Sequence, residues 1–315
     1  MEESQLNRRN FLKSGLTGAA LLALGFKSDS VFAKDDFTKL TILHTNDVHS
    51  RIDPFPMDGS RNAGKGGVAP RATLINKIRS EEKNILLLDA GDIFQGTPYF
   101  NFYGGELEIK IMSMMGYDAS IMGNHDFDNG IEGFVKQLPH ANFPFLNANY
   151  DFIDTPMEGK SKGYQIFNKD GIKIGVYGLG IELNGLVNSQ QYGNTKYLNP
   201  IAKALEMENF LKLNQKCDLV ICLSHLGFKY KENKVSDIVL AQSTYHTDLI
   251  IGGHTHTFLS APESVVNKNG QETLVNQVGF AGINLGRIDF IFSKAKNKKV
   301  TYNSAIEVIE NNFNF

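Results

Sequence analysis

Short apolar runs alternate with amphipathic stretches along the first two thirds of the chain. Residues 84–89 form a continuous apolar run, which is typical of a strand buried on both faces. Similar runs at 40–45, 219–223 and 247–251 predict further strands. Apolar positions three or four residues apart predict helices, at 72–80, 105–116, 201–214 and 235–241. Strands separated by helices indicate an α/β fold.

The second half adds a predicted hairpin and a strand-rich tail. Asp170-Gly171 lies between apolar runs at 166–167 and 172–179, and Asp-Gly is a strong hairpin turn signal. We therefore expect a second sheet with antiparallel members. Alternating stretches predict three strands that close this second sheet, at 274–278, 286–293 and 300–309. Shorter strands are expected at 117–122 and 145–149.

Aspartate, asparagine and histidine residues follow the ends of these strands. Asp47 and His49 are two residues apart, and extended geometry would turn both side chains to the same side. Later strands are followed by five further candidates: Asp92, Asn124, His225, His254 and His256. In a layered α/β fold such strand ends gather at one edge, where ligands bind. Seven nitrogen and oxygen donors without a thiolate suit Mn, Fe, Co, Ni or Zn, and their number suits two ions that share a carboxylate.

Bulk composition narrows the function classes. The 315 residues carry a formal net charge of −2, so charge gives no support for binding nucleic acid or an anionic membrane. Cys217 and Cys222 stand five residues apart on one predicted strand, roughly 16 Å apart. That separation is beyond disulfide reach, so both are expected to be small buried side chains.

The N-terminus has the features of an export signal. Arg8 and Arg9 precede Phe-Leu-Lys, a mildly apolar run covers 15–26, and a small-residue cleavage site covers 31–33. The apolar run is too short to span a bilayer. The paired arginines resemble a twin-arginine signal, so we expect residues 1–33 to direct export of a periplasmic or secreted chain. The alternative is an uncleaved amphipathic N-terminal helix. No cysteine lies near the expected cleavage site, so the sequence does not support a lipoprotein anchor.

A loop rich in glycine and proline covers residues 53–67. It contains Gly64-Lys65-Gly66-Gly67 but lacks the spacing of a phosphate-binding P-loop. The sequence leaves two roles for this loop: it covers the mouth of a site, or it is a simple surface loop.

Five sequence blocks occur in an order typical of one superfamily. The order is Asp-x-His, Gly-Asp, Gly-Asn-His-Asp, His and Gly-His-x-His, spread over residues 40–290. It resembles the calcineurin-like metallophosphoesterases, and the segments 42–49 and 123–128 resemble their 5′-nucleotidase branch. The resemblance implies a four-layer α/β/β/α sandwich with two mixed sheets and a dinuclear metal site at the strand ends, within one domain over residues 34–315.

The resemblance also implies a role for each candidate. Asp47, His49 and His256 would hold one ion, Asn124, His225 and His254 the other, and Asp92 would bridge them. A hydroxide between the two ions would attack the phosphorus of a phosphate ester. His125 would stabilise the transition state or protonate the leaving group, and Asp128 would orient its imidazole.

The substrate is less defined than the chemistry. Secreted bacterial 5′-nucleotidases carry a second domain that binds the base, and the residues after 290 are too few to build one. Either a separate polypeptide supplies that function, or the substrate is another ester such as a cyclic nucleotide or a sugar phosphate. A non-catalytic binding protein on this fold is the third alternative. His44 is expected in the core or behind the ligands, and His140 and His246 in solvent.

Overall fold

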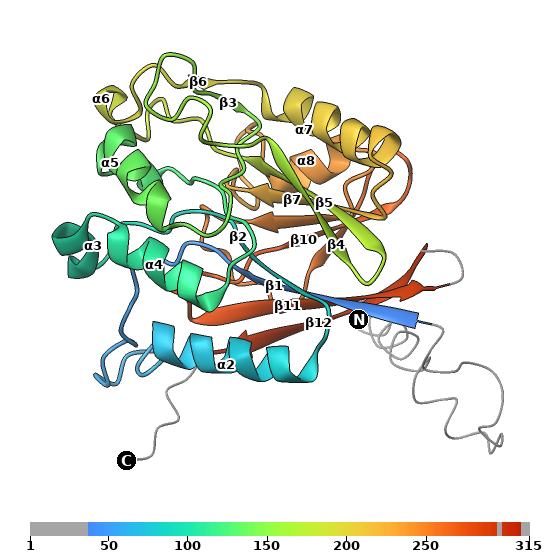
Figure 1. Ribbon diagram of the computed structural model, residues 1–315, viewed down its shortest axis with the longest axis horizontal. Helices are drawn as coiled ribbons and strands as arrows, with labels where there is room; N and C mark the ends of the chain where they lie inside the picture. The colour runs from blue at the N-terminus through green and yellow to red at the C-terminus, as the bar shows by residue number, and fades with distance from the viewer. Residues whose placement is uncertain (1–36, 295–297, 310–315) are drawn as a thin grey trace, which may run out of the picture. The chain divides into compact units, whose positions relative to one another are not determined.

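The computed structural model describes residues 37–294 and 298–309 (Figure 1). From Thr38 onward these residues belong to one compact unit. The export segment expected at residues 1–33 lies outside the described residues. Among the described helices, none is long and apolar enough to cross a membrane.

The first sheet has the strand order β12-β11-β1-β2. β1 (Phe37–Thr45) pairs in parallel with β2 (Ile85–Asp89), whereas β11 (Asn284–Ser293) and β12 (Lys298–Val308) form an antiparallel pair beside β1. The prediction that these two tail strands close the second sheet was therefore wrong. Alternating burial along β11 identifies it as a strand with one face in a core, but alternation does not determine the neighbouring strand.

The second sheet has the order β4-β5-β7-β8-β10-β9. β5 (Ile172–Leu179), β7 (Leu219–Ser224), β8 (Leu249–Gly252) and β10 (Glu272–Asn276) are parallel, and β4 (Tyr164–Lys169) and β9 (Glu263–Val266) pair antiparallel at its edges. The predicted hairpin is confirmed as β4–β5. Asp170 and Gly171 both have positive φ at its turn, as a tight hairpin requires.

Helices cover the outer face of each sheet. Apolar residues of α2 (Val68–Glu81), α4 (Glu106–Met115) and α5 (Gly130–Gln137) pack with Leu43 and Leu87 of the first sheet. Those of α7 (Pro200–Asn209) and α8 (Asp237–Ser243) pack on the second. A third core joins the inner faces of the two sheets, with Leu40 and Ile42 against residues such as Ile174. The four-layer α/β/β/α sandwich is thereby confirmed (Figure 1).

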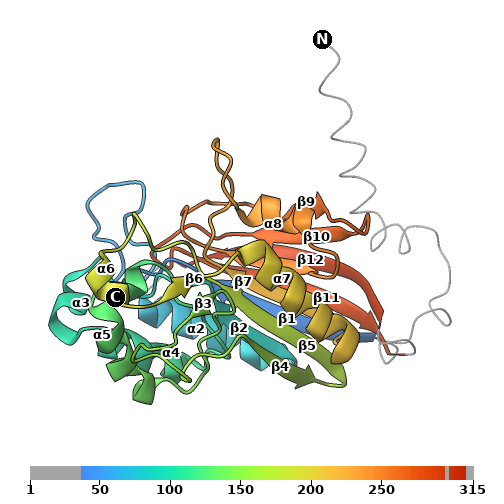
Figure 2. The same ribbon diagram turned by 90° about the horizontal axis from the view of Figure 1, so that it is seen from above.

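Smaller elements complete the fold. They are α3 (Pro98–Tyr103), α6 (Ser189–Tyr192), the pair β3 (Tyr150–Asp151) and β6 (Lys196–Tyr197), the 3₁₀ helices η2 (His125–Phe127) and η3 (Leu138–His140), and a π-helical turn η4 (Phe210–Asn214) that extends α7. Helices α3, α5 and α6 gather beyond the carboxyl end of β1 (Figures 1 and 2).

Two predicted strands are reduced to isolated bridges. Ala119 bridges Leu88, and Ser120 bridges Phe145, so the stretches at 117–122 and 145–149 continue the first sheet without a regular ladder. Scattered backbone hydrogen bonds still join these stretches, as when the Leu146 amide donates to the Ser120 carbonyl at 2.8 Å. Asn147 Oδ1 adds a side-chain bond by accepting from the Met122 amide at 3.2 Å.

Glu208 of α7 is a buried charge that fixes the start of β8. Its carboxylate accepts hydrogen bonds from the amides of Tyr245, His246 and Thr247 and from the Thr247 hydroxyl, each at 2.9 Å. Four donors would lose their acceptor together if this carboxylate were removed.

We therefore expect Glu208→Ala to lower the free energy of unfolding by about 3 kcal/mol, because buried unpaired donors are costly. Denaturant titration of the protein measures this. Glu206→Ala is the matched control: that side chain is 56% exposed and pairs with Lys203 at the surface, so its loss is expected below about 0.5 kcal/mol. Equal stability of the two variants would contradict the assigned role of Glu208.

Candidate metal centre

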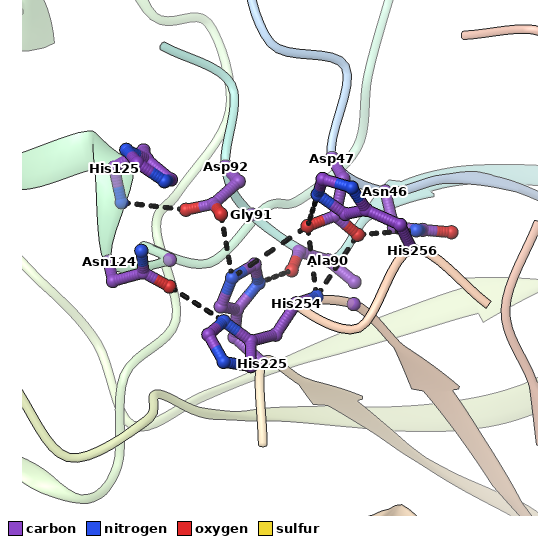
Figure 3. Close-up of polar contacts among 12 residues, drawn as sticks. Asn46, Asp47, Ala90, Gly91, Asp92, Asn124, His125, His225, His254 and His256 are labelled. Atoms are coloured by element: carbon purple, nitrogen blue, oxygen red, sulfur yellow. Dashed lines mark hydrogen bonds and ion pairs between the residues drawn. The ribbon is translucent and has the colours of Figure 1, made fainter. Parts of the chain in front are cut away.

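The carboxyl ends of parallel strands from both sheets meet at one place. β1 leads to Asp47 and His49, β2 leads to Asp92, β7 leads to His225, and β8 leads to His254. Figure 3 shows these side chains, except that of His49, turned toward a common space. The expectation that strand ends would bring the candidates together is met by the fold itself.

The backbone at the candidate ligands is unusual. Asp47, His49, Asp92, His254 and His256 have φ angles of 50°, 51°, 55°, 71° and 51°, all in the left-handed region. Non-glycine residues adopt this region rarely and with strain, which typically persists where function requires it. The expectation that Asp47 and His49 share a side through extended geometry was wrong: a left-handed turn brings them together.

The first group of side chains consists of Asp47, His49 and His256. His49 Nε2 lies 2.9 Å from His256 Nε2, and His256 Nε2 lies 3.5 Å from Asp47 Oδ1. Asp47 is fully buried, whereas the His256 side chain is 41% exposed. Two imidazole nitrogens and a carboxylate oxygen thus converge at the mouth of the centre.

The second group consists of Asp92, His225 and His254. His225 Nε2 lies 3.1 Å from Asp92 Oδ2, and Asn124 Oδ1 lies 2.8 Å from His254 Nδ1. Asp92 Oδ2 is also 3.9 Å from His49 Nε2 of the first group. Asp92 therefore lies between the two groups, where a shared ligand would have to be.

Hydrogen bonds to backbone groups fix the orientation of these side chains. His225 Nδ1 bonds the Ala90 carbonyl at 2.7 Å, and His49 Nδ1 bonds the Phe94 carbonyl at 3.2 Å. Each bond makes Nδ1 a protonated nitrogen, so Nε2 is the ring atom that would bind a cation. The Asp47 carboxylate in turn accepts from the His254 amide, with N···O distances of 2.9 and 3.1 Å.

The electrostatics of the centre favour a cation. Burial lowers the pKa of His225, but the carboxylates of Asp92 and Asp47 outweigh it and raise that pKa to about 10. His225 Nε2 is buried and makes no properly directed hydrogen bond to any described group. An orphaned nitrogen between two carboxylates fits a divalent metal ligand, and the N/O donor set suits first-row ions.

His125 and Asp128 form a pair beside the two groups. His125 Nδ1 lies 2.8 Å from Asp128 Oδ2, and the imidazole is 41% exposed. The hydrogen bond to Asp128 raises the pKa of His125 against the opposing effect of burial. The His125 ring lies 5.3 Å from that of His49 in edge contact, so the pair faces the centre without joining either group.

The sequence did not single out Asp126. Its buried carboxylate accepts from the amides of Asp92, Ile93, Phe94 and Gly123, at 2.7 to 3.2 Å, and so holds the β2 turn against the Gly-Asn-His-Asp block. Burial, together with the charge of Asp92, raises the pKa of Asp126 to about 8. The only sequence signal was its place within that block.

The remaining histidines differ in their surroundings. His44 is fully buried with Nε2 3.0 Å from Asn276 Nδ2, so it is a core residue between the sheets, and burial lowers its pKa to about 3. His140 and His246 are half-buried rather than solvated.

The 53–67 loop reaches the neighbourhood of the centre. Phe280 stacks on His256 at 5.2 Å between ring centroids, and Phe55 of the loop contacts Phe280 at 6.4 Å. This contact favours a loop that covers one side of the site mouth.

A family comparison matches this geometry. The sequence pattern of the calcineurin-like phosphoesterases matches residues 40–258. The chain belongs to this family. The resemblance of the five sequence blocks is therefore confirmed, and the chain carries a phosphoesterase domain of the hydrolase class.

Curated relatives are named 5′-nucleotidases. The snake venom 5′-nucleotidase of Crotalus adamanteus is 35% identical over 281 residues, which cover 82% of this chain and 46% of that protein. The 5′-nucleotidase of Vibrio vulnificus is 33% identical over 325 residues, which cover 94% of this chain and 57% of that protein. The chain thus spans about half the length of the relatives it matches.

Solved structures of nucleotidases have a similar fold. A 5′-nucleotidase precursor from Thermus thermophilus superposes with a TM-score of 0.78 at 31% identity, covering 87% of this chain and 55% of that one. The NAD nucleotidase of Haemophilus influenzae superposes with a TM-score of 0.76 at 30% identity, covering 87% and 51%.

Close packing of backbone at the centre provides a test. A Cβ atom on Gly123 would lie 2.2 Å from Asp92 Oδ1 and 2.7 Å from His225 Cε1, so an alanine there must displace both side chains. We expect Gly123→Ala to weaken metal binding at least tenfold, which elemental analysis after dialysis and metal titration would measure.

Gly163→Ala is the matched control, because its Cβ would meet only ordinary contacts, beginning with Met207 Sδ at 3.5 Å. Circular dichroism would establish that both variants fold. Unchanged metal content and affinity in Gly123→Ala would contradict the placement of the centre.

Proposed function

We propose that this chain is a metal-dependent phosphomonoesterase that removes phosphate from nucleotides. The observation that carries the proposal is the convergence of two Asp/His groups, joined through Asp92, with His125 beside them. Family membership supports phosphate ester hydrolysis, and the names of the relatives support a nucleotide as the ester.

Seven side chains would hold the metals. Asp47, His49 and His256 would bind one ion, Asn124, His225 and His254 the second, and Asp92 both. Two divalent ions would supply Lewis acidity, lowering the pKa of a water molecule and neutralising phosphate oxygens. Nitrogen and oxygen donors of this kind accept Mn, Zn, Fe, Co or Ni.

His125 would act on the leaving group. Its exposed imidazole lies outside both groups and is free to contact a phosphate ester, while Asp128 fixes Nδ1 as the protonated nitrogen and favours the imidazolium. An imidazolium can stabilise charge on the phosphoryl group or pass its Nε2 proton to the departing alkoxide. Asp128 would then be a positioning residue.

We also propose that residues 1–33 direct export and that the mature domain covers 34–315. The support is the Arg8-Arg9 pair followed by a short apolar run and a small-residue site. Periplasmic or secreted localisation would follow from that route.

Phosphate release from AMP by the metal-loaded protein tests the function. We expect turnover that chelation abolishes and that a divalent ion restores, with p-nitrophenyl phosphate as a second substrate. A kcat/KM for AMP more than about tenfold higher would correspond to about 1.4 kcal/mol of additional transition-state binding. Absence of phosphate release from both esters with all five candidate metals would contradict the proposal.

Replacement of Asp128 tests the role of the His125–Asp128 pair. Asp128→Asn is expected to lower kcat for AMP about 10- to 100-fold with little change in KM, because it removes the carboxylate that holds and stabilises the His125 imidazolium. Asp170→Asn, an exposed carboxylate in the β4–β5 turn, is the control and should retain full activity. A normal kcat in Asp128→Asn would remove Asp128 from the mechanism.

A further inference from the structure

A cleft of about 750 Å³ opens beside the candidate metal centre. It is lined by three segments: the stretch 181–186 after β5, the stretch 197–200 before α7, and the stretch 226–235 after β7. His254 of the centre also lines it. The volume lies within the range of small-molecule sites.

The topology explains why the cleft and the centre adjoin. β5, β7 and β8 are neighbouring parallel strands, so the segments that follow them leave the same edge of the second sheet. The segment after β8 carries His254, which lies 2.8 Å from Asn124 of the centre. An ester whose phosphate lies at the centre can therefore extend its organic part past His254 into the cleft.

Two tyrosine rings form part of the cleft wall. The Tyr230 hydroxyl donates to the Leu226 carbonyl at 2.8 Å, and its ring carries Lys234 Nζ at 5.6 Å from the centroid. A Cβ atom on Gly227 would lie 2.2 Å from the Tyr230 hydroxyl, so residue 227 must be glycine for the tyrosine to occupy this position. Tyr230 is thus held by its polar end, and its half-buried ring lines the cleft with Lys234 over one face.

Tyr197 stands on β6 and is half-buried, with its ring 6.3 Å from that of Tyr150. Burial and then the charge of Glu182 raise the pKa of Tyr197, and both residues line the cleft. Exposed amides from Asn184, Asn199 and Asn233 complete the polar wall.

We propose that this cleft binds the nucleoside part of the substrate, with Tyr197 and Tyr230 contacting the base and the carboxylate and amides contacting the sugar and the base edge. The proposal rests on the proposed function, because a nucleotide is the ester in question. Aromatic rings hold nucleobases through their faces with little dependence on sequence, and carboxylates and amides pair with hydroxyl groups and ring nitrogens. The specificity element would then lie in this chain, next to its own metal centre.

The experiment measures adenosine binding and ester selectivity in the metal-loaded protein. We expect Tyr197→Leu and Tyr230→Leu each to weaken adenosine binding about tenfold by calorimetry. The same variants should lower the ratio of kcat/KM for AMP to that for glycerol 2-phosphate about tenfold, mainly through a higher KM for AMP. Tyr230→Phe retains the ring but loses the hydroxyl bond to Leu226, and should stay within about threefold of the parent.

Tyr245→Leu is the matched control outside the cleft. Tyr245 is 36% exposed and carries Lys268 Nζ at 5.6 Å from its ring centroid, the same arrangement as Tyr230 and Lys234. Its removal should change neither readout. If a leucine variant does not fold, Asn184→Trp provides the test, because an indole at this exposed position would fill the cleft and should abolish adenosine binding.

Three outcomes would overturn the inference: no adenosine binding by the parent, unchanged binding in the leucine and tryptophan variants, or equal losses for AMP and glycerol 2-phosphate. Hydrolysis of glycerol 2-phosphate with no adenosine binding would remove the cleft and leave the phosphoesterase function standing. Adenosine binding that depends on the two tyrosines, without hydrolysis of either ester, would support the cleft and refute the proposed function.

Discussion

The carboxylate of Asp47 is the interaction on which the site depends. Asp47 follows the end of β1 in the first sheet, and His254 follows the end of β8 in the second sheet. Both oxygens of the Asp47 carboxylate accept a hydrogen bond from the His254 amide. The backbone carbonyl of Asp47 accepts from the Ala281 amide at 2.7 Å. One buried residue thus connects the two sheets at the edge where all candidate ligands gather. A buried carboxylate is tolerable only when it is fully hydrogen-bonded or paired with positive charge, so the sheets must be aligned for this residue to be stable.

The same constraint accounts for the strained backbone around it. Ordinary strand geometry would carry the chain straight out of the sheet, whereas a left-handed residue turns it back within a few ångströms. The close approach of the backbone after β8 to His225 also requires a glycine. A Cβ atom on Gly253 would lie 2.8 Å from His225 Nδ1. The inter-sheet core and the Asp126 hydrogen bonds supply the stability that holds these conformations in place.

Much of this arrangement could be predicted from the sequence, and the remainder could not for identifiable reasons. Apolar runs locate β2 and β7 because strands buried on both faces have a distinctive composition, and the polar residues after them mark the shared edge. The partner of β11 was mispredicted because an alternating strand fits any sheet with one open face. Asp47 and His49 were placed side by side for the wrong reason, since a left-handed backbone at single residues leaves no periodic signal in the sequence. Asp126 was missed because its partners are backbone amides, which no sequence pattern displays.

The left-handed turns at Asp47 and Asp92 have a consequence for protein engineering. Asparagine and aspartate share a tolerance for this conformation that β-branched residues lack. An exchange of carboxylate for amide at Asp92 would change the charge of the centre in a residue that keeps this tolerance, whereas at Asp47 it would also remove one of the two oxygens that accept from the His254 amide. The fold therefore separates two properties that most sites combine: the path of the backbone and the charge offered to a cation. At Asp92 the charge of the centre can be lowered by one unit with a residue that accepts the same left-handed backbone.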